Sequence, residues 1–205
     1  MLNDSLIDKL QYAALSYLET HLDKRYTYHN AAHTLAVCNA VKLFAEASGL
    51  PLQTYFSLRI AAVFHDFGYL EQSFDNEKLA RPYLEEFGRK FGIDEKFLLQ
   101  ANDLILETVF PYTPLTPAGS LLCDADIEYI GRECFFQHAG LFRQELAGDG
   151  IVYTDEQWWE METGFLQDNK FFTPVCRRLR NVGRLNNLKT AQEYLLAARE
   201  ECCRS

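Results

Sequence analysis

The adjacent pair His65-Asp66 directly follows an apolar run at 61–64. An imidazole and a carboxylate each cost free energy to bury unless a partner binds them. Side chains of the same two kinds occur both upstream and downstream of the pair. We predict that one divalent cation is bound by four side chains: His33, His65, Asp66 and Asp126. The alternative is that these four are polar core residues that satisfy one another.

A mixed set of imidazole and carboxylate ligands suits Mn, Fe, Co, Ni or Zn, and suits Mg less well. Four protein ligands leave positions on a six-coordinate ion for water and for a phosphate oxygen. A cation held in this way can orient a phosphoester, neutralise developing charge and activate water. These ligand types therefore favour metal-dependent hydrolysis.

The neighbours of the predicted ligands leave two assignments open. His29 precedes His33 by four residues, which on a helix places both on one face as two ligands, or as a ligand beside a proton donor. Asp124 competes with Asp126 for the last ligand position, because residues two apart cannot share a helix face. The spacing is not HExxH, and no phosphate-binding GxxxxGK loop, GxSxG elbow or GxGxxG turn occurs.

The elements that must position these residues all show helical spacing of apolar side chains. Asn3, Asp4 or Ser5 can cap the first helix, Pro82 must kink or divide the fourth, and Thr154 with Gln157 forms a capping box. The expected helices cover 6–17, 31–47, 52–66, 76–91, 94–105, a stretch opened by Ser120, 134–146, one begun at Thr154, one opened by Thr173-Pro174, and 187–201. No run alternates like a strand, so we predict an all-α bundle.

The length of 205 residues and the 48% hydrophobic content suit a single domain, 1–205. Within it we place the metal-binding motifs at about 26–131 and C-terminal helices at 154–201. Prolines at 111, 114 and 117 mark a rigid loop that is too short to separate domains.

A net charge of −9 disfavours non-specific binding of nucleic acid or of an acidic membrane, but allows a small phosphorylated substrate. No apolar stretch approaches the ~20 residues of a membrane helix, and the N-terminus does not resemble a signal peptide. The six cysteines form no CxxC pair. We therefore expect a cytoplasmic protein in a reducing compartment. A homodimer is one possible assembly.

The order His33, His65-Asp66, Asp126 resembles the H…HD…D signature of the HD superfamily of metal-dependent phosphohydrolases. Further segments extend the resemblance. The sequence YHNAAH at 28–33 is similar to the opening motif of cyclic-nucleotide phosphodiesterases, and DNEKLA at 75–80 and DAD at 124–126 resemble small stand-alone bacterial members.

The resemblance implies an HD-domain helical bundle with the four ligands in one cleft. It also implies that His29 is the general acid that protonates the leaving oxygen, since histidine titrates near neutral pH. Glu77 is a candidate for orienting a ligand or activating water. The alternatives are a histidine bonded to backbone at a helix start, and a first-turn carboxylate favoured by the helix dipole.

One departure from the family limits the prediction. Members with two metals use extra histidines between the HD pair and the last aspartate, whereas this chain has none between His65 and His138. We therefore expect one ion. A sensor that binds metal and nucleotide without turnover is the first alternative, and an HD-type di-iron oxygenase is the second.

The segment 170–189 contains six basic residues and no acidic one. From it we select Lys170 and Arg177 as candidates that bind a substrate phosphate. The alternative is a solvated helix face that balances the acidic body. The sequence as a whole predicts a mononuclear phosphohydrolase that cleaves a small phosphoester, a nucleotide or a related diester by attack of metal-bound water.

Overall fold

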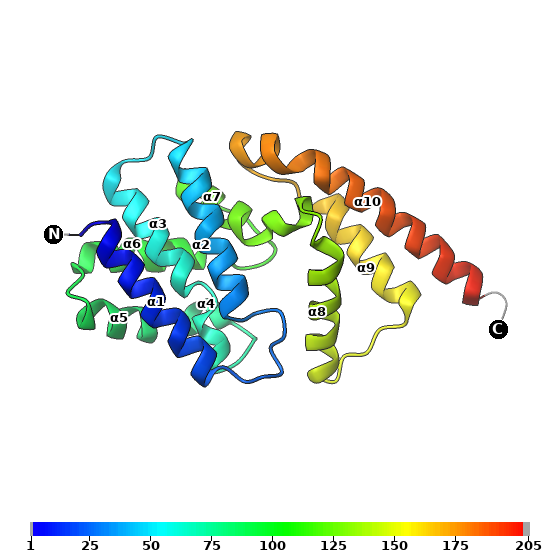
Figure 1. The fold of residues 1–205 in the computed structure, drawn as a ribbon, viewed down its shortest axis with the longest axis horizontal. Coiled ribbons are helices and arrows are strands. Elements are labelled where there is room, and N and C mark those ends of the chain that lie inside the picture. The colour runs from blue at the N-terminus through cyan, green and yellow to red at the C-terminus, as the bar shows by residue number, and fades with distance from the viewer. Residues whose placement is uncertain (1, 203–205) are drawn as a thin grey trace. The chain divides into compact units, whose positions relative to one another are not determined.

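A computed structural model describes residues 2–202 of the chain, so Cys203 lies outside the described residues. The predicted all-α class is confirmed: the described residues form α-helices and two short 3₁₀ helices, with no strand among them (Figure 1). No helix in this range combines the length and the apolar character that crossing a membrane requires.

The chain packs as two compact units. The first contains the chain up to Lys24 and His29–Asp126, and the second contains Arg25–Tyr28 and the chain from Ile127 onward. This division is finer than the single domain that the sequence predicts. The single domain stays a prediction. The proline-rich loop lies inside the first unit, so it is not the boundary between the two.

Helix α3 (Leu52–Phe64) is the central element of the first unit, because every residue from Phe56 to Phe64 is buried. A helix that is apolar on all sides must be surrounded. It packs against α1 (Asp4–His21), α2 (Ala31–Glu46) and α6 (Glu95–Leu106) (Figure 1). The one charged side chain of this stretch, Arg59, is paired with two carboxylates of α1, those of Asp4 and Asp8.

Two short helices follow α3, and the second of them carries Glu77. The 3₁₀ helix η1 (Phe67–Leu70) touches α4 (Asn76–Leu79) so closely that a Cβ at Gly68 would lie 1.9 Å from the backbone oxygen of Asn76. Only glycine allows this approach. Of the kink or division predicted at Pro82, the structure shows a division, with α5 (Arg81–Lys90) beginning one residue before the proline.

Helix α7 (Pro117–Ile127) begins three residues earlier than the start predicted at Ser120. Proline suits the first position of a helix, where no backbone N–H donor is needed. The Glu107 carboxylate accepts hydrogen bonds from Leu115 N (2.6 Å) and from Thr116 N (3.0 Å) and Oγ1 (2.9 Å). A glutamate at the end of α6 thus anchors the loop that leads into α7.

The second unit is built from η2 (Glu128–Gly131), α8 (Phe135–Gly148), α9 (Asp155–Asp168) and α10 (Pro174–Cys202). The predicted capping box of α9 is present. The two last helices predicted separately are one continuous helix, α10, which is a correction. This helix needs glycine at position 183, because a Cβ there would lie 2.1 Å from the oxygen of Gly131 in η2.

A buried carboxyl in α9 makes the second unit sensitive to pH. Glu162 is 4% exposed, and burial raises its pKa to about 7 from an ordinary value of 4.5. A carboxyl whose folded-state pKa is raised contributes full stability below about pH 4.5, and that contribution is lost as the pH rises through about 7. At pH 8 we expect Glu162→Gln to be more stable than the wild type by up to about 3 kcal/mol.

Urea unfolding at pH 4.5 and at pH 8 measures this difference. The matched control is Glu193→Gln, because Glu193 is exposed on α10. We expect the control to change the free energy of unfolding equally at both pH values. A Glu162→Gln gain that is the same at pH 4.5 and pH 8 would contradict the role of this buried charge.

Candidate metal centre

His33 lies in the first turn of α2, where an asparagine cap fixes its backbone. The Asn30 side-chain oxygen accepts hydrogen bonds from Ala32 N (2.9 Å) and from His33 N (3.3 Å). Asparagine is a preferred N-cap because its oxygen satisfies amide groups that have no partner inside the helix. The imidazole of His33 is consequently directed into the first unit, where it is 7% exposed.

The pair His65-Asp66 forms the turn from α3 into η1, since α3 ends at Phe64 and not at 66 as predicted. His65 Nδ1 lies 3.0 Å from the carbonyl oxygen of Ala62. A carbonyl only accepts hydrogen bonds, so Nδ1 carries the proton and donates it. The Nε2 atom of neutral His65 then presents a lone pair, which is the form that binds metals.

Asp126 lies near the end of α7 and brings its carboxylate to both imidazoles. Its Oδ1 lies 3.0 Å from His33 Nε2 and 3.5 Å from His65 Nε2. Asp124 is fully buried, and its position two residues earlier puts it on another face of the helix. This geometry favours Asp126 over Asp124 as the fourth ligand.

Three of the four predicted ligands, His33, His65 and Asp66, converge in the first unit, and the fourth, Asp126, lies beside the two imidazoles. The Nε2 atoms of His33 and His65 are 3.3 Å apart, and Asp66 Oδ2 lies 3.3 Å and 3.2 Å from them. Ligand atoms of these three residues all lie within 4.8 Å of one another. Adjacent ligands on an octahedral ion with bonds of about 2.1 Å are about 3 Å apart, so the atoms fit a single divalent cation.

One oxygen of the cluster has no hydrogen bond. Asp66 Oδ2 is buried and has no hydrogen-bond partner among the described residues, although both Nε2 atoms are near it. A buried carboxylate oxygen that accepts no hydrogen bond is costly. A cation between this oxygen and the two nitrogens would remove that cost.

The charges of the cluster also favour a bound cation. Burial lowers the pKa of His33, but its hydrogen bond with Asp126 and the negative charges of Asp126 and Asp66 outweigh that effect and raise the pKa to about 9. Burial raises the pKa values of both carboxyls, yet the imidazoles lower them below their usual range. The site therefore favours positive charge, which either protons or one divalent cation can supply.

His29 is close to the cluster, but it is not on the helix of His33. Since α2 begins at Ala31, the predicted common helix face of the two histidines is wrong. The two rings are nevertheless 5.8 Å apart between centroids, and the His29 ring is stacked on Tyr69 at 4.3 Å. The stacked tyrosine follows the His65-Asp66 pair by three residues, and its role was not anticipated from the sequence.

Glu77 begins the first turn of α4 and is half-buried near the carboxylates of the cluster. Burial raises its pKa, and the negative charges of Asp66 and Asp126 raise it further against a backbone hydrogen bond that lowers it. Both effects make Glu77 easier to protonate than an ordinary glutamate. A carboxyl in this state can exchange a proton with a bound molecule.

Lys170 and Arg177 lie in the second unit, whereas the four predicted ligands lie in the first. Both are exposed, and an Arg177 nitrogen lies 3.5 Å from the carbonyl oxygen of Phe171. Their binding of substrate stays a prediction.

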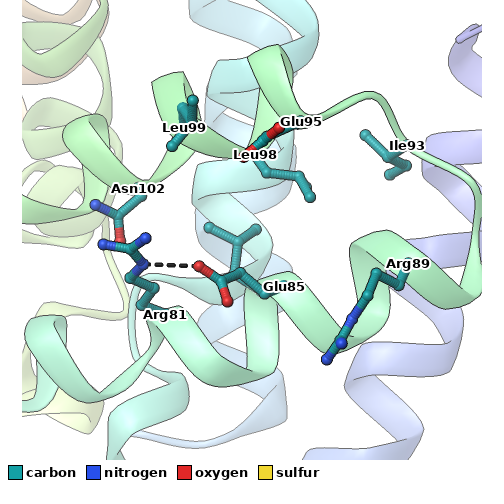
Figure 2. Close-up of a pocket in the computed structure, with 9 residues that line it drawn as sticks. Arg81, Glu85, Arg89, Ile93, Glu95, Leu98, Leu99 and Asn102 are labelled. Atoms are coloured by element: carbon teal, nitrogen blue, oxygen red, sulfur yellow. Dashed lines mark hydrogen bonds and ion pairs between the residues drawn. The ribbon is translucent and has the colours of Figure 1, made fainter.

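A pocket of about 340 Å³ lies between α5 and α6, away from the side chains named above. Ile93, Leu98 and Leu99 contribute to its apolar lining, and an Arg81–Glu85 ion pair of 2.7 Å borders it (Figure 2). None of the predicted site residues lines this pocket.

Comparisons with protein-family models, curated proteins and solved structures find no match to this chain.

Proposed function

We propose that this protein is a cytoplasmic HD-type phosphohydrolase that uses one divalent metal ion to cleave a small phosphoester, a nucleotide or a related diester. Its ligands are His33, His65, Asp66 and Asp126. Their imidazole and carboxylate atoms suit Mn, Fe, Co, Ni or Zn. When bound, such an ion polarises a phosphate oxygen and supplies an activated water.

The observation that carries the proposal is the buried Asp66 Oδ2, which has no hydrogen bond and faces two imidazole nitrogens. A cluster that served only packing would be expected to pair this oxygen with a donor. His33 and His65 add two further ligand atoms of the right chemical type beside this oxygen, and Asp126 lies next to both imidazoles.

The side chains around the cluster have roles that their positions support. His29, held flat against Tyr69, is the group that donates a proton to the leaving oxygen of the substrate. Glu77 accepts or returns a proton on the nucleophile side, a role that suits a carboxyl whose pKa is raised by burial and by the charges of Asp66 and Asp126. The imidazoles are almost fully buried, while Asp66 and Asp126 are 13% and 15% exposed, so substrate approaches from the carboxylate side.

Metal analysis of the purified chain together with a substrate panel tests the proposal. We expect about one divalent ion per chain and hydrolysis of at least one class in a panel of phosphomonoesters, nucleotides and cyclic or linear diesters. Dialysis against a chelator should reduce this activity at least about 10²-fold, and one equivalent of the ion should restore it.

The possible results separate the alternatives. Stoichiometric metal without turnover of any phosphoester, but with nucleotide binding, would favour the sensor. Two irons per chain with oxygen-dependent turnover would favour the di-iron oxygenase. A chain that binds no divalent ion would overturn the proposal.

A further inference from the structure

The carboxylate of Asp126 has different partners on its two oxygens. Oδ1 faces the imidazoles, at 3.0 Å from His33 Nε2. Oδ2 accepts a hydrogen bond of 3.0 Å from the Tyr112 hydroxyl. The tyrosine therefore holds the oxygen that is turned away from the imidazoles.

Tyr112 belongs to the proline-rich loop, which is fixed at its other end. The Glu107 carboxylate binds two backbone amides and one hydroxyl of that loop, at Leu115 and Thr116. Phe110 packs edge-on against the Tyr112 ring at 5.4 Å between centroids. The hydroxyl is thus held in place by neighbours that do not themselves belong to the ligand cluster.

A carboxylate can bind a cation through one oxygen or through both. If Oδ2 of Asp126 turned toward the ion, it would occupy a coordination position that water or a phosphate oxygen needs. Retention of Oδ2 by a hydrogen bond prevents that rotation. The structure assigns to Tyr112 the role of a positioning residue that keeps Asp126 a one-oxygen ligand and so keeps a coordination position open for substrate; this inference rests on the proposed function.

Titration of the metal-free full-length protein with Co²⁺ alone tests this role, because the visible spectrum of Co²⁺ depends on its coordination number and ligands. Tyr112→Phe removes only the hydroxyl. We expect the variant to show an altered Co²⁺ spectrum and a Kd for Co²⁺ changed about 10-fold or more, since partners of metal ligands typically contribute 10- to 100-fold in affinity. The melting temperature without metal reports whether the fold is retained.

The matched control is Tyr55→Phe, which removes a hydroxyl that donates to Asp4 on α1 over 3.1 Å, outside the ligand cluster. We expect its Co²⁺ spectrum and Kd to equal those of the wild type. A Tyr112→Phe variant with the wild-type spectrum, whatever its melting temperature, would overturn the role of Tyr112 alone. A wild-type protein that binds no Co²⁺ would overturn the proposed metal centre and this role together.

Discussion

His65→Ala is expected to remove both the bound cation and the hydrolytic activity. His65 Nε2 lies within 3.5 Å of ligand atoms from His33, Asp66 and Asp126, so it is at the centre of the cluster. Its loss leaves three ligands and places two carboxylates beside one imidazole. We expect the metal content after dialysis to fall below about 0.1 ion per chain, and kcat/KM to fall at least about 10³-fold.

The matched control is His21→Ala. His21 is an exposed histidine of the same unit, in the last turn of α1, where its ring stacks on Tyr17 at 3.9 Å. The His21→Ala variant should retain the ion and the activity, with at most a small loss of stability. Elemental analysis of both variants after identical dialysis provides the comparison. Full metal occupancy in His65→Ala would contradict the ligand assignment even if activity were lost.

His29→Ala should have the second largest effect, but without loss of metal. The His29 ring lies beside the cluster and is held by Tyr69, yet it is not one of the four ligands. We expect the ion to be retained and kcat to fall ~10²- to 10⁴-fold, which is the usual contribution of a positioned general acid. Steady-state kinetics at matched metal occupancy measures this loss.

The leaving group supplies a sharper test of the same role. A proton donor matters most when the departing oxygen is strongly basic, and least for a p-nitrophenyl ester, whose phenolate leaves without protonation. His29→Ala should therefore lose much less activity on a p-nitrophenyl ester than on the corresponding alkyl ester. An equal loss on both esters would exclude proton donation to the leaving group and leave His29 a structural neighbour of the cluster.

The helices could largely be predicted because their signals are local. Asn3 caps α1 by accepting a hydrogen bond from Leu6 N. The capping box of α9 could be predicted because a threonine stands three residues before a glutamine. Two of the errors occurred where a residue outside the segment decides a boundary. Helix α7 starts at Pro117 in a loop anchored by Glu107, and α10 continues through Gly183 because η2 packs closely against that glycine.

By itself, the sequence determined which residue types are available for a metal centre and two of their local placements. His65 and Asp66 are neighbours in the chain, so a turn that directs one of these side chains to the cluster keeps the other near it. Asn30 fixes His33 at the start of α2 through a local cap. These are short-range effects, which depend on bonds and hydrogen bonds within a few residues.

Only the tertiary structure decided which of Asp124 and Asp126 faces the imidazoles, and that Tyr112 donates a hydrogen bond to Asp126 while Tyr69 stacks on His29. Asp126 meets His33 across 93 positions of sequence. Such a contact depends on how α2, α3 and α7 pack and on the rotation of each helix about its own axis. That rotation is set by the burial of all apolar faces together, and no spacing along a single segment specifies it.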